Sequence, residues 1–500
     1  MGFFKAYDMR GTFGKDFDLD TVYKVGRALP RVVPGKRWLV GRDARLSSPA
    51  VAAALVKGLR DAGMEVTDLG LATTPMVYFF TAEEDFDGSV MVTASHNPPS
   101  DNGLKVSKRG ALPVGYESGL AEVERMVNDA TGTVAPPEIA QRLAPPSGGA
   151  IVPIAQRFAL PSGGAIVPIA QKTDPIRLAK YVAWLKAHAP TDVSSLRFAV
   201  DCSDGMASIL AHELFPNAVF LNDAPDGSFP HHSPNPLLAE SREQVAATVR
   251  DQKLDCGVIF DGDADRCMFV DETGAFIQPD YLIPILASTF LPQTIEQSEQ
   301  SEQSEQSEQS EQSEQSNNPF VVIHDVRTSR AAIERIREMG AKPVIGKVGH
   351  AYAKVLLREV KAVCGGELAG HYYFRDFHGC DSGELAALRI LGAFAQAKAR
   401  GLSPSAFMAP VNRKYANSGE VNFHVADKPA AIARVLAAAK DLAPETGRTD
   451  IDGYRLEYDA GWVSVRQSNT EPLLRLIVEC DTPARLKDWL ARLTGAIETE

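Results

Sequence analysis

Strand-like and helix-like patterns alternate near the N-terminus, and this alternation restricts the possible folds more than any other feature of the chain. RWLVGRD (37–43) is an apolar run that ends in polar residues. SPAVAAALVKGLRDAG (48–63) has helical apolar spacing, with Ser48 as the predicted N-cap and Gly63 as the stop signal. MEVTDLG (64–70) returns to a strand pattern. Strands that alternate with helices favour an α/β fold, in which helices cover both faces of a parallel sheet.

Similar patterns return further along the chain. LRFAVDCSDG (196–205) is a strand that runs into a turn, and PFVVIHDV (319–326) resumes the α/β style. WVSVRQSNTEPLLRLIVEC (462–480) contains two strand-like runs around a polar loop. A chain of 500 residues is expected to form three or four domains. We predict domains at 1–145, 174–275, 276–404 and 405–500, with a linker at 146–173.

Two segments of biased sequence interrupt these patterns. PSGGAIVPIAQ occurs at 146–156 and again, unchanged, at 161–171. This duplication is too short for a solenoid, so we expect it to extend the linker without a functional role. Residues 296–316 are seven Glu-Gln-Ser repeats without an apolar side chain. We expect this insertion in the third domain to be disordered or a loosely helical, solvated loop.

The formal net charge of -12 argues against nucleic acid as a partner, because such proteins neutralise phosphates with Lys and Arg. A local Arg cluster can still bind a small anion. The six cysteines form no CxxC pair, so neither a zinc site nor a redox motif is predicted. No secretory signal is apparent, and no apolar stretch approaches the ~20 residues of a membrane span. We expect a cytoplasmic enzyme, monomeric or dimeric, with no membrane partner.

The first candidate functional loop is TASHNPPSDNG (93–103), which follows an apolar run and contains Ser95 and His96. A serine hydroxyl is a poor nucleophile unless it is activated or already modified. The GxSxG elbow is absent, which disfavours an α/β-hydrolase. Taken alone, the serine is more typical of a turn cap.

The second loop, DGDADR (261–266), places three alternating aspartates on one side of an extended segment. Three hard oxygen ligands suit Mg²⁺ or Ca²⁺. An EF-hand does not fit, because Arg266 replaces the invariant glycine and the flanking segments are strands. A solvated acidic turn is the alternative. Arg266 weighs against it, because a cation next to a metal suggests a bound phosphate.

Two further loops carry residues suited to binding a sugar phosphate. GGELAGH (365–371) has three glycines that let the backbone approach a ligand, with Glu367 and His371 as polar groups. RQSNTEP (466–472), with Arg475 downstream, combines the side chains and loop amides that cradle a phosphate dianion. Each loop alone is also compatible with an ordinary turn.

Together the four loops resemble the α-D-phosphohexomutase family, and most closely its bacterial phosphomannomutase/phosphoglucomutase members. In family order, TASHNP resembles the phosphoserine loop, DGDADR the Mg²⁺ loop, GGELAGH the sugar-binding loop and RQSNTEP the phosphate-binding loop. YDMRGTFG at the N-terminus and FPHHSPNP (229–236) are similar to further family landmarks. The resemblance implies four domains around a central cleft: three related mixed α/β sheet domains and a C-terminal α+β domain.

The resemblance also implies a reaction. The enzyme would interconvert hexose 6-phosphate and hexose 1-phosphate, with mannose or also glucose as the sugar, through a phosphoserine and a hexose 1,6-bisphosphate that also acts as activator. Ser95 would carry the phosphoryl group, and Mg²⁺ would be held by Ser95, Asp261, Asp263 and Asp265. The other implied roles are charge stabilisation by Arg10 and Arg266, proton transfer by Lys105 and His371, and substrate binding by Tyr7, His96, Glu367, Ala369, Arg466, Ser468, Asn469, Thr470 and Arg475.

One position departs from the family pattern. The sugar loop usually reads Glu-X-Ser-Gly, but Ala369 stands here in place of the serine. The lost hydrogen bond corresponds to roughly 0.5–1.5 kcal/mol, which is too little to abolish binding. A phosphoglucosamine mutase and a non-catalytic sugar-phosphate-binding protein are the alternatives. The presence of Ser95 together with all three aspartates argues against the second.

Overall fold

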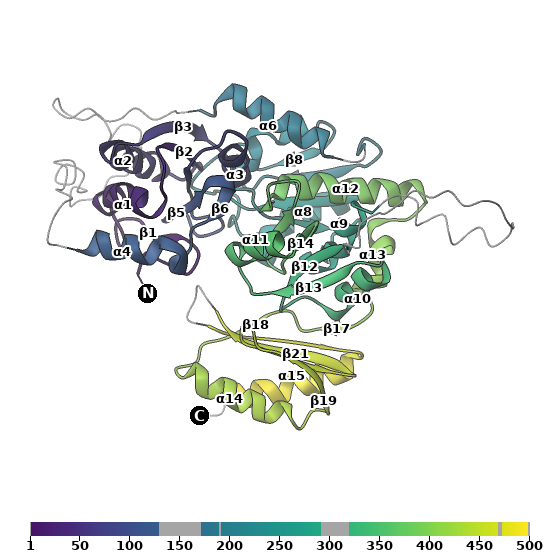
Figure 1. Ribbon diagram of the computed structural model, residues 1–500. Helices are drawn as coiled ribbons and strands as arrows, with labels where there is room; N and C mark the ends of the chain where they lie inside the picture. Colours follow the sequence, from purple (N-terminus) through teal and green to yellow (C-terminus); the bar gives the residue numbers. More distant parts are fainter. Residues whose placement is uncertain (1, 130–171, 190–191, 292–319, 469–472, 499–500) are drawn as a thin grey trace, which may run out of the picture.

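The computed structural model describes residues 2–129, 172–189, 192–291, 320–468 and 473–498 (Figure 1). The duplicated segment 146–171, the Glu-Gln-Ser tract 296–316 and the loop residues Asn469 and Thr470 lie outside the described residues. Our expectations for them therefore stay predictions.

The N-terminal part folds around a mixed sheet of order β1-β5-β4-β2-β3, with β6 beside β5. Its strands are β1 (Met9–Thr12), β2 (Arg37–Arg42), β3 (Glu65–Leu71), β4 (Gly88–Val92), β5 (Asp101–Lys108) and β6 (Leu112–Pro113). Its helices are α1 (Leu19–Val32), α2 (Ser48–Asp61), α3 (Thr74–Glu83) and α4 (Ala121–Asn128). Neighbouring residues of β2 face opposite sides: Val40 packs with residues of α1 and α2, and Leu39 packs with residues of α3. Helices therefore cover both faces.

Two more sheets follow, of order β11-β10-β9-β7-β8 and β13-β12-β14-β15-β16. The first contains β7 (Phe198–Asp201), β8 (Val219–Leu221), β9 (Cys256–Phe260), β10 (Cys267–Val270) and β11 (Phe276–Ile277), with α6 (Pro175–Ala187), α7 (Ala211–Leu214) and α8 (Ala239–Gln252). The second contains β12 (Val321–Asp325), β13 (Lys342–Gly346), β14 (Cys364–Gly366), β15 (Tyr372–Phe374) and β16 (Cys380–Asp381), with α9 (Leu282–Ser288), α10 (Arg330–Glu338), α11 (His350–Glu359), α12 (Gly383–Ala399) and α13 (Pro404–Asn412).

The three sheets share one pattern of strand pairing. In each, a central strand (β2, β7 or β12) has a parallel neighbour on either side. The neighbour on one side then pairs with the next strand in the antiparallel direction: β4 with β5, β9 with β10, and β14 with β15. The serine loop, the aspartate loop and the glycine-rich loop each join such an antiparallel pair. Three of the four predicted loops therefore occupy the same place in a repeated fold.

The C-terminal sheet is antiparallel and has the order β17-β22-β21-β20-β19, with β18 beside β22. Its elements are β17 (Ala416–Asn417), β18 (Val421–Phe423), β19 (Glu445–Thr449), β20 (Tyr454–Tyr458), β21 (Gly461–Gln467), β22 (Leu474–Cys480), α14 (Lys428–Ala439) and α15 (Pro483–Glu498). Both helices lie on the face of the sheet that points away from the other domains (Figure 1). This α+β unit and the three mixed sheets confirm the predicted fold class.

The apolar core shows how the domains are joined. One cluster of buried side chains runs through the first three sheet domains and includes Phe79, Tyr181 and Phe377. The C-terminal domain has a separate core built on Trp489 and its neighbours. Its link to the third domain includes polar contacts, such as those from the Arg330 guanidinium to the carbonyl oxygens of Tyr458 and Gly461, both at 2.7 Å. The first three domains therefore share one apolar cluster, which the C-terminal domain does not join.

Three smaller expectations can be compared with the structure. Helix α2 begins at Ser48 with Ser47 as its N-cap residue, so the prediction of Ser48 as N-cap was wrong by one position. The Ser48 hydroxyl instead donates a hydrogen bond to Asp43. All six cysteines are free and buried. None of the described helices combines the length and the apolar character that a membrane span requires.

Candidate active site

Ser95 lies in the loop after β4, with its backbone in the left-handed region at φ 54°. Its N–H donates to the Thr93 hydroxyl at 2.8 Å, which helps to fix this conformation. Its side-chain hydroxyl donates to Asp261 Oδ2 at 2.8 Å and lies 3.1 Å from His96 Nδ1. Burial, followed by the charge of Arg266, lowers the pKa of His96 well below its ordinary value. The serine hydroxyl thus points from the first domain to the aspartate loop of the second.

The three aspartates of that loop are fully buried between β9 and β10, and their carboxylate oxygens come within 4.8 Å of one another. Burial, together with the charges of Asp263 and Asp265, raises the pKa of Asp261 well above its ordinary value. Burial would also raise the pKa of Asp265, but Lys105 and His371 outweigh it and hold that pKa below its ordinary value. The loop therefore gathers three carboxyl groups in a buried site, where the pKa values of Asp261 and Asp265 shift in opposite directions.

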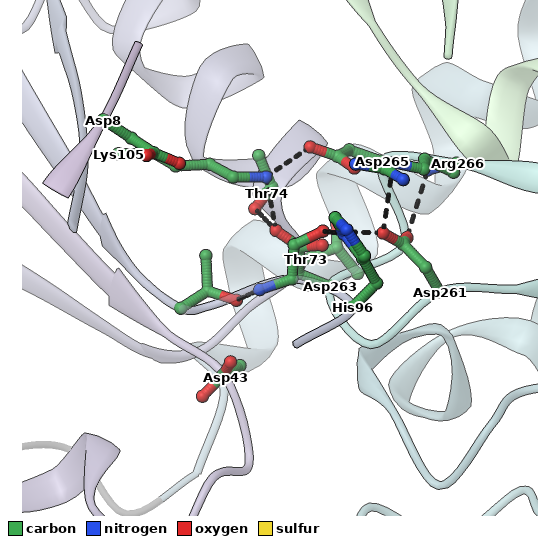
Figure 2. Close-up of polar contacts among 12 residues, drawn as sticks. Asp8, Asp43, Thr73, Thr74, His96, Lys105, Asp261, Asp263, Asp265 and Arg266 are labelled. Carbon is green, nitrogen blue, oxygen red and sulfur yellow. Dashed lines mark hydrogen bonds and ion pairs between the residues drawn. The ribbon is translucent and has the colours of Figure 1, made fainter. Parts of the chain in front are cut away.

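Side chains from the first domain contact this acidic cluster, as Figure 2 shows. Lys105 on β5 donates to Asp263 Oδ2 at 2.7 Å and to Asp265 Oδ2 at 2.5 Å. Burial would lower the pKa of Lys105, but these two carboxylates raise it above its ordinary value. Thr74, at the start of α3, donates its hydroxyl to Asp263 Oδ2 at 2.5 Å. Lys105 is therefore a cation in this arrangement, and its role in proton transfer stays a prediction.

Arg10 and Arg266 both lie near the serine loop, since the charges of both lower the pKa of His96. Arg10, on β1, donates to Asn97 Oδ1 at 3.0 Å and to Asp8 Oδ2 at 2.5 Å. Arg266 donates from Nε to His371 Nε2 at 3.0 Å. Both guanidinium groups are held in place by hydrogen bonds, and their role in charge stabilisation stays a prediction.

His371 is held by a buried chain of polar contacts in the third domain. Its Nδ1 is 2.7 Å from Asp381 Oδ2, and Lys354 Nζ is 2.7 Å from Asp381 Oδ1. Because the Arg266 N–H is donated to Nε2, the ring proton lies on Nδ1 and faces Asp381. Asp381 and Lys354 carry no motif signal, and the sequence reasoning missed both.

The glycine-rich loop holds Glu367 in a polar environment. Glu367 Oε1 accepts from the Gly349 N–H at 3.1 Å and from the Tyr373 hydroxyl at 3.0 Å. Burial raises the pKa of Glu367. Tyr7, from the first domain, donates its hydroxyl to Val348 O at 2.9 Å, next to this loop. Ala369 lies partly exposed at the turn.

The fourth loop joins β21 and β22, where Arg466 and Arg475 stand opposite each other. Arg466 Nη1 lies 3.5 Å from Asp452 Oδ2, and Arg475 Nη1 lies 2.7 Å from Glu420 Oε1. Ser468 is buried at the entrance to the loop, where its N–H donates to Leu473 O at 2.9 Å.

Arg327 links this region to the glycine-rich loop, and the sequence reasoning missed it. Its guanidinium is 3.7 Å from Glu367 Oε2 and 3.6 Å from Glu420 Oε2. Arg327 follows β12 in the polar segment after the strand, which is the signal that could have drawn attention to it. The structure thus connects the candidate sugar loop with the candidate phosphate loop.

Comparison with known proteins identifies the family. Models of the four domains of phosphoglucomutase/phosphomannomutase, alpha/beta/alpha domains I to III and the C-terminal domain, match residues 1–132, 179–274, 306–413 and 420–496. The chain belongs to the α-D-phosphohexomutase family. The predicted resemblance is therefore confirmed.

Relatives within the family cover almost the whole chain. A phosphohexose mutase of Xanthomonas campestris is 34% identical over 488 residues, covering 97% of this chain and 96% of the relative. A phosphomannomutase of Escherichia coli strain K12 is 33% identical over 477 residues, covering 95% and 94%. A crystal structure of a phosphoglucomutase/phosphomannomutase family protein from Burkholderia thailandensis aligns with a TM-score of 0.76 at 29% identity, covering 99% and 97%. The chain is a hexose-phosphate mutase, an enzyme of the isomerase class.

A buried carboxyl next to the aspartate loop leads to a prediction about pH. Helix α12 starts against that loop, where a Cβ on Gly383 would meet Ala264 O at 2.6 Å. The next residue, Glu384, is fully buried and accepts from the Ser382 hydroxyl at 2.9 Å. Burial raises the pKa of Glu384 to about 8. The protonated form is therefore favoured in the folded protein.

Replacing Glu384 with Gln should stabilise the protein more as the pH rises. A raised pKa stabilises the fold at low pH, and this contribution is lost as the pH rises from the ordinary value of 4.5 to about 8. Glutamine cannot ionise, so its advantage should grow by up to about 1.4 kcal/mol per pH unit in that window. Melting temperatures at several pH values would measure it, with the exposed Glu240→Gln as control. A difference that does not change with pH would contradict the prediction.

Proposed function

We propose that Ser95 carries the phosphoryl group by which this mutase interconverts hexose 6-phosphate and hexose 1-phosphate through a 1,6-bisphosphate. The observation that carries the proposal is the 2.8 Å hydrogen bond from Ser95 Oγ to Asp261 Oδ2. It brings a hydroxyl of one domain to a buried carboxylate cluster of another. Mannose phosphate is the proposed substrate, and glucose phosphate a second.

Mg²⁺ is the proposed cofactor, and the residues present fit it. Asp261, Asp263, Asp265 and a phosphate on Ser95 would hold the ion, which would screen negative charge during transfer. Asp263 Oδ1 and Asp265 Oδ1 are buried without a hydrogen-bond partner among the described residues. Oxygens left in this way are expected to face a cation.

A second group of possible ligands, formed by Asp265, His371 and Asp381, is less suitable. The Asp381 carboxylate already contacts His371 Nδ1 and Lys354 Nζ, both at 2.7 Å. A divalent cation at this place would have to displace both of these contacts. The aspartate loop also has a lysine neighbour, Lys105, but its Asp263 Oδ1 and Asp265 Oδ1 have no hydrogen-bond partner among the described residues, and it is the proposed metal site.

Transfer from phosphoserine breaks the bond between phosphorus and Ser95 Oγ and forms a bond to the sugar hydroxyl. The hydroxyl proton must go to a base, and His371 Nε2 is the proposed acceptor: its lone pair accepts the Arg266 N–H at 3.0 Å and would have to exchange that contact for the sugar hydroxyl. Arg10, Arg266 and Lys105 supply positive charge. In the second half-reaction, the other phosphate of the bisphosphate returns to Ser95.

The two remaining loops would bind the part of the substrate that does not react. Glu367 would accept hydrogen bonds from sugar hydroxyls, and Arg466 and Arg475 would bind the distal phosphate together with Ser468. Arg327 extends this set, because it lies between Glu367 and Glu420. Tyr7, His96 and Ala369 are also proposed to contact the substrate.

An intact-mass measurement tests the proposal. The dephosphorylated chain would be incubated with glucose 1,6-bisphosphate and Mg²⁺, and a mass gain of one phosphoryl group, located on Ser95 by peptide mapping, is expected. Conversion of mannose 6-phosphate to mannose 1-phosphate should accompany it. Absence of any gain at saturating bisphosphate would instead favour the alternative of a non-catalytic binder. Comparison of mannose, glucose and glucosamine phosphates would rank the sugars.

A further inference from the structure

Arg45 is a fully buried arginine beneath the serine loop, in the segment between β2 and α2. Its Nη2 donates to Ser95 O at 2.8 Å and to Asn97 O at 2.7 Å. Its Nη1 donates to Pro98 O at 2.6 Å and to Asp101 O at 3.0 Å. Its Nε donates to Asp43 Oδ2 at 3.1 Å. All five N–H groups of the guanidinium are thus used, four of them by backbone carbonyls of one loop.

These contacts hold the backbone of the serine loop at Ser95, the residue with a strained conformation. Ser95 has φ 54°, a strained conformation for a non-glycine residue, which must be held by its surroundings. The Ser95 carbonyl lies between Arg45 and the aspartate loop, since a Cβ on Gly262 would meet Ser95 O at 2.5 Å. Fixing this carbonyl helps to fix the Ser95 backbone beside the aspartate loop, from where its hydroxyl reaches Asp261 Oδ2.

Arg45 also lies where the first two domains meet. Its backbone forms a bridge with Gly227, where a Cβ would meet Ala44 O at 2.1 Å. The ring of Phe229 covers the guanidinium, with 5.1 Å from Cζ to the ring centroid. Phe229 begins the segment FPHHSPNP, which has no place in the proposed chemistry. The same arginine therefore contacts the serine loop and the domain that carries the aspartates.

We infer that Arg45 is a positioning residue for phosphoryl transfer: it holds the Ser95 loop in register with the aspartate loop across the domain boundary. The inference rests on the proposed function of Ser95. A guanidinium is required because its planar donors reach four carbonyls that diverge from one another, whereas a lysine ammonium has three donors at one point. Phe229 supports the arginine from the second domain by keeping water from it.

Arg45→Lys should lower kcat and the rate of Ser95 loading from glucose 1,6-bisphosphate by about tenfold, because small errors of position are costly in transfer reactions. The KM for mannose 1-phosphate should change by less than about twofold, since Arg45 contacts Asp43, the serine loop and Phe229 rather than the residues proposed to bind the sugar and the distal phosphate. Arg42→Lys is the matched control: Arg42 is a buried arginine at the end of β2 whose Nη1 donates to Asp43 O. It should leave the loading rate unchanged.

A second variant covers the case in which Arg45→Lys does not fold. Phe229→Leu removes the covering ring from the second domain and should lower the loading rate by a smaller factor, about threefold, at unchanged KM. Rates are expressed per folded molecule, so a loss of stability alone does not move them. If wild-type protein is loaded on Ser95 and neither variant alters the rate, the inference is overturned while the proposed function stands. If wild-type protein is not loaded, the proposed function itself fails.

Discussion

Ser95→Ala should lower mutase turnover by at least about a thousandfold, because it removes the atom to which the phosphoryl group is attached. The fold should persist. The loop is held through the backbone of Ser95, whose N–H donates to Thr93 and whose carbonyl accepts from Arg45, and alanine keeps both groups. The melting temperature should therefore stay close to that of the wild type, while phosphoryl loading from glucose 1,6-bisphosphate disappears.

Ser100→Ala is the control for this experiment. Ser100 lies in the same loop, but it is exposed, and its hydroxyl donates to Asp101 Oδ1 at a long 3.4 Å. Its replacement should leave turnover unchanged. If Ser95→Ala kept its turnover, or took up a phosphoryl group at the wild-type rate, Ser95 would not be the carrier, and the reaction would need another acceptor.

The sequence alone was sufficient to predict which residues lie together when they belong to one short motif at the end of a strand. The three aspartates lie within five residues of one another, so the loop between β9 and β10 brings their carboxylates together whatever the rest of the chain does. Ser95 likewise follows directly from the end of β4. These arrangements depend on residues that are close in the sequence, and for this reason the motifs and the α/β alternation could be predicted from the sequence alone.

Contacts between domains could not be read in the same way. Lys105 and Asp263 are 158 positions apart, and Arg266 and His371 are 105 apart. No periodicity connects such residues, because their proximity depends on how separate sheets pack. Arg45 illustrates the limit: it stands among polar residues after β2, but the carbonyls that it binds belong to a loop some fifty positions later. That the serine, aspartate and glycine-rich loops occupy equivalent positions in their sheets could be recognised only from the strand order.

Arg466→Ala should weaken binding of hexose 1-phosphate and hexose 6-phosphate by a similar factor. The two half-reactions place different ends of the sugar at Ser95, so the distal phosphate is on C6 in one and on C1 in the other. A phosphate dianion presents similar oxygens on either carbon, and one arginine site can therefore serve both. Loss of a charge-assisted, bidentate contact should cost roughly 1.5–3 kcal/mol, or about 10- to 150-fold in Kd.

The measurement must be one of binding, because the equilibrium constant fixes the ratio of kcat/KM in the two directions and any variant changes both equally. Titration calorimetry in a Ser95→Ala background gives a separate Kd for mannose 1-phosphate and mannose 6-phosphate without turnover. Arg448→Ala, an exposed arginine on β19 of the same domain, is the control and should leave both unchanged. Arg466 differs from this control because its side chain is only 3% exposed and because it pairs with Arg475 across the β21–β22 hairpin. If only one of the two sugar phosphates lost affinity, the enzyme would have to hold its two distal phosphates in separate places, and the sugar would turn over between them.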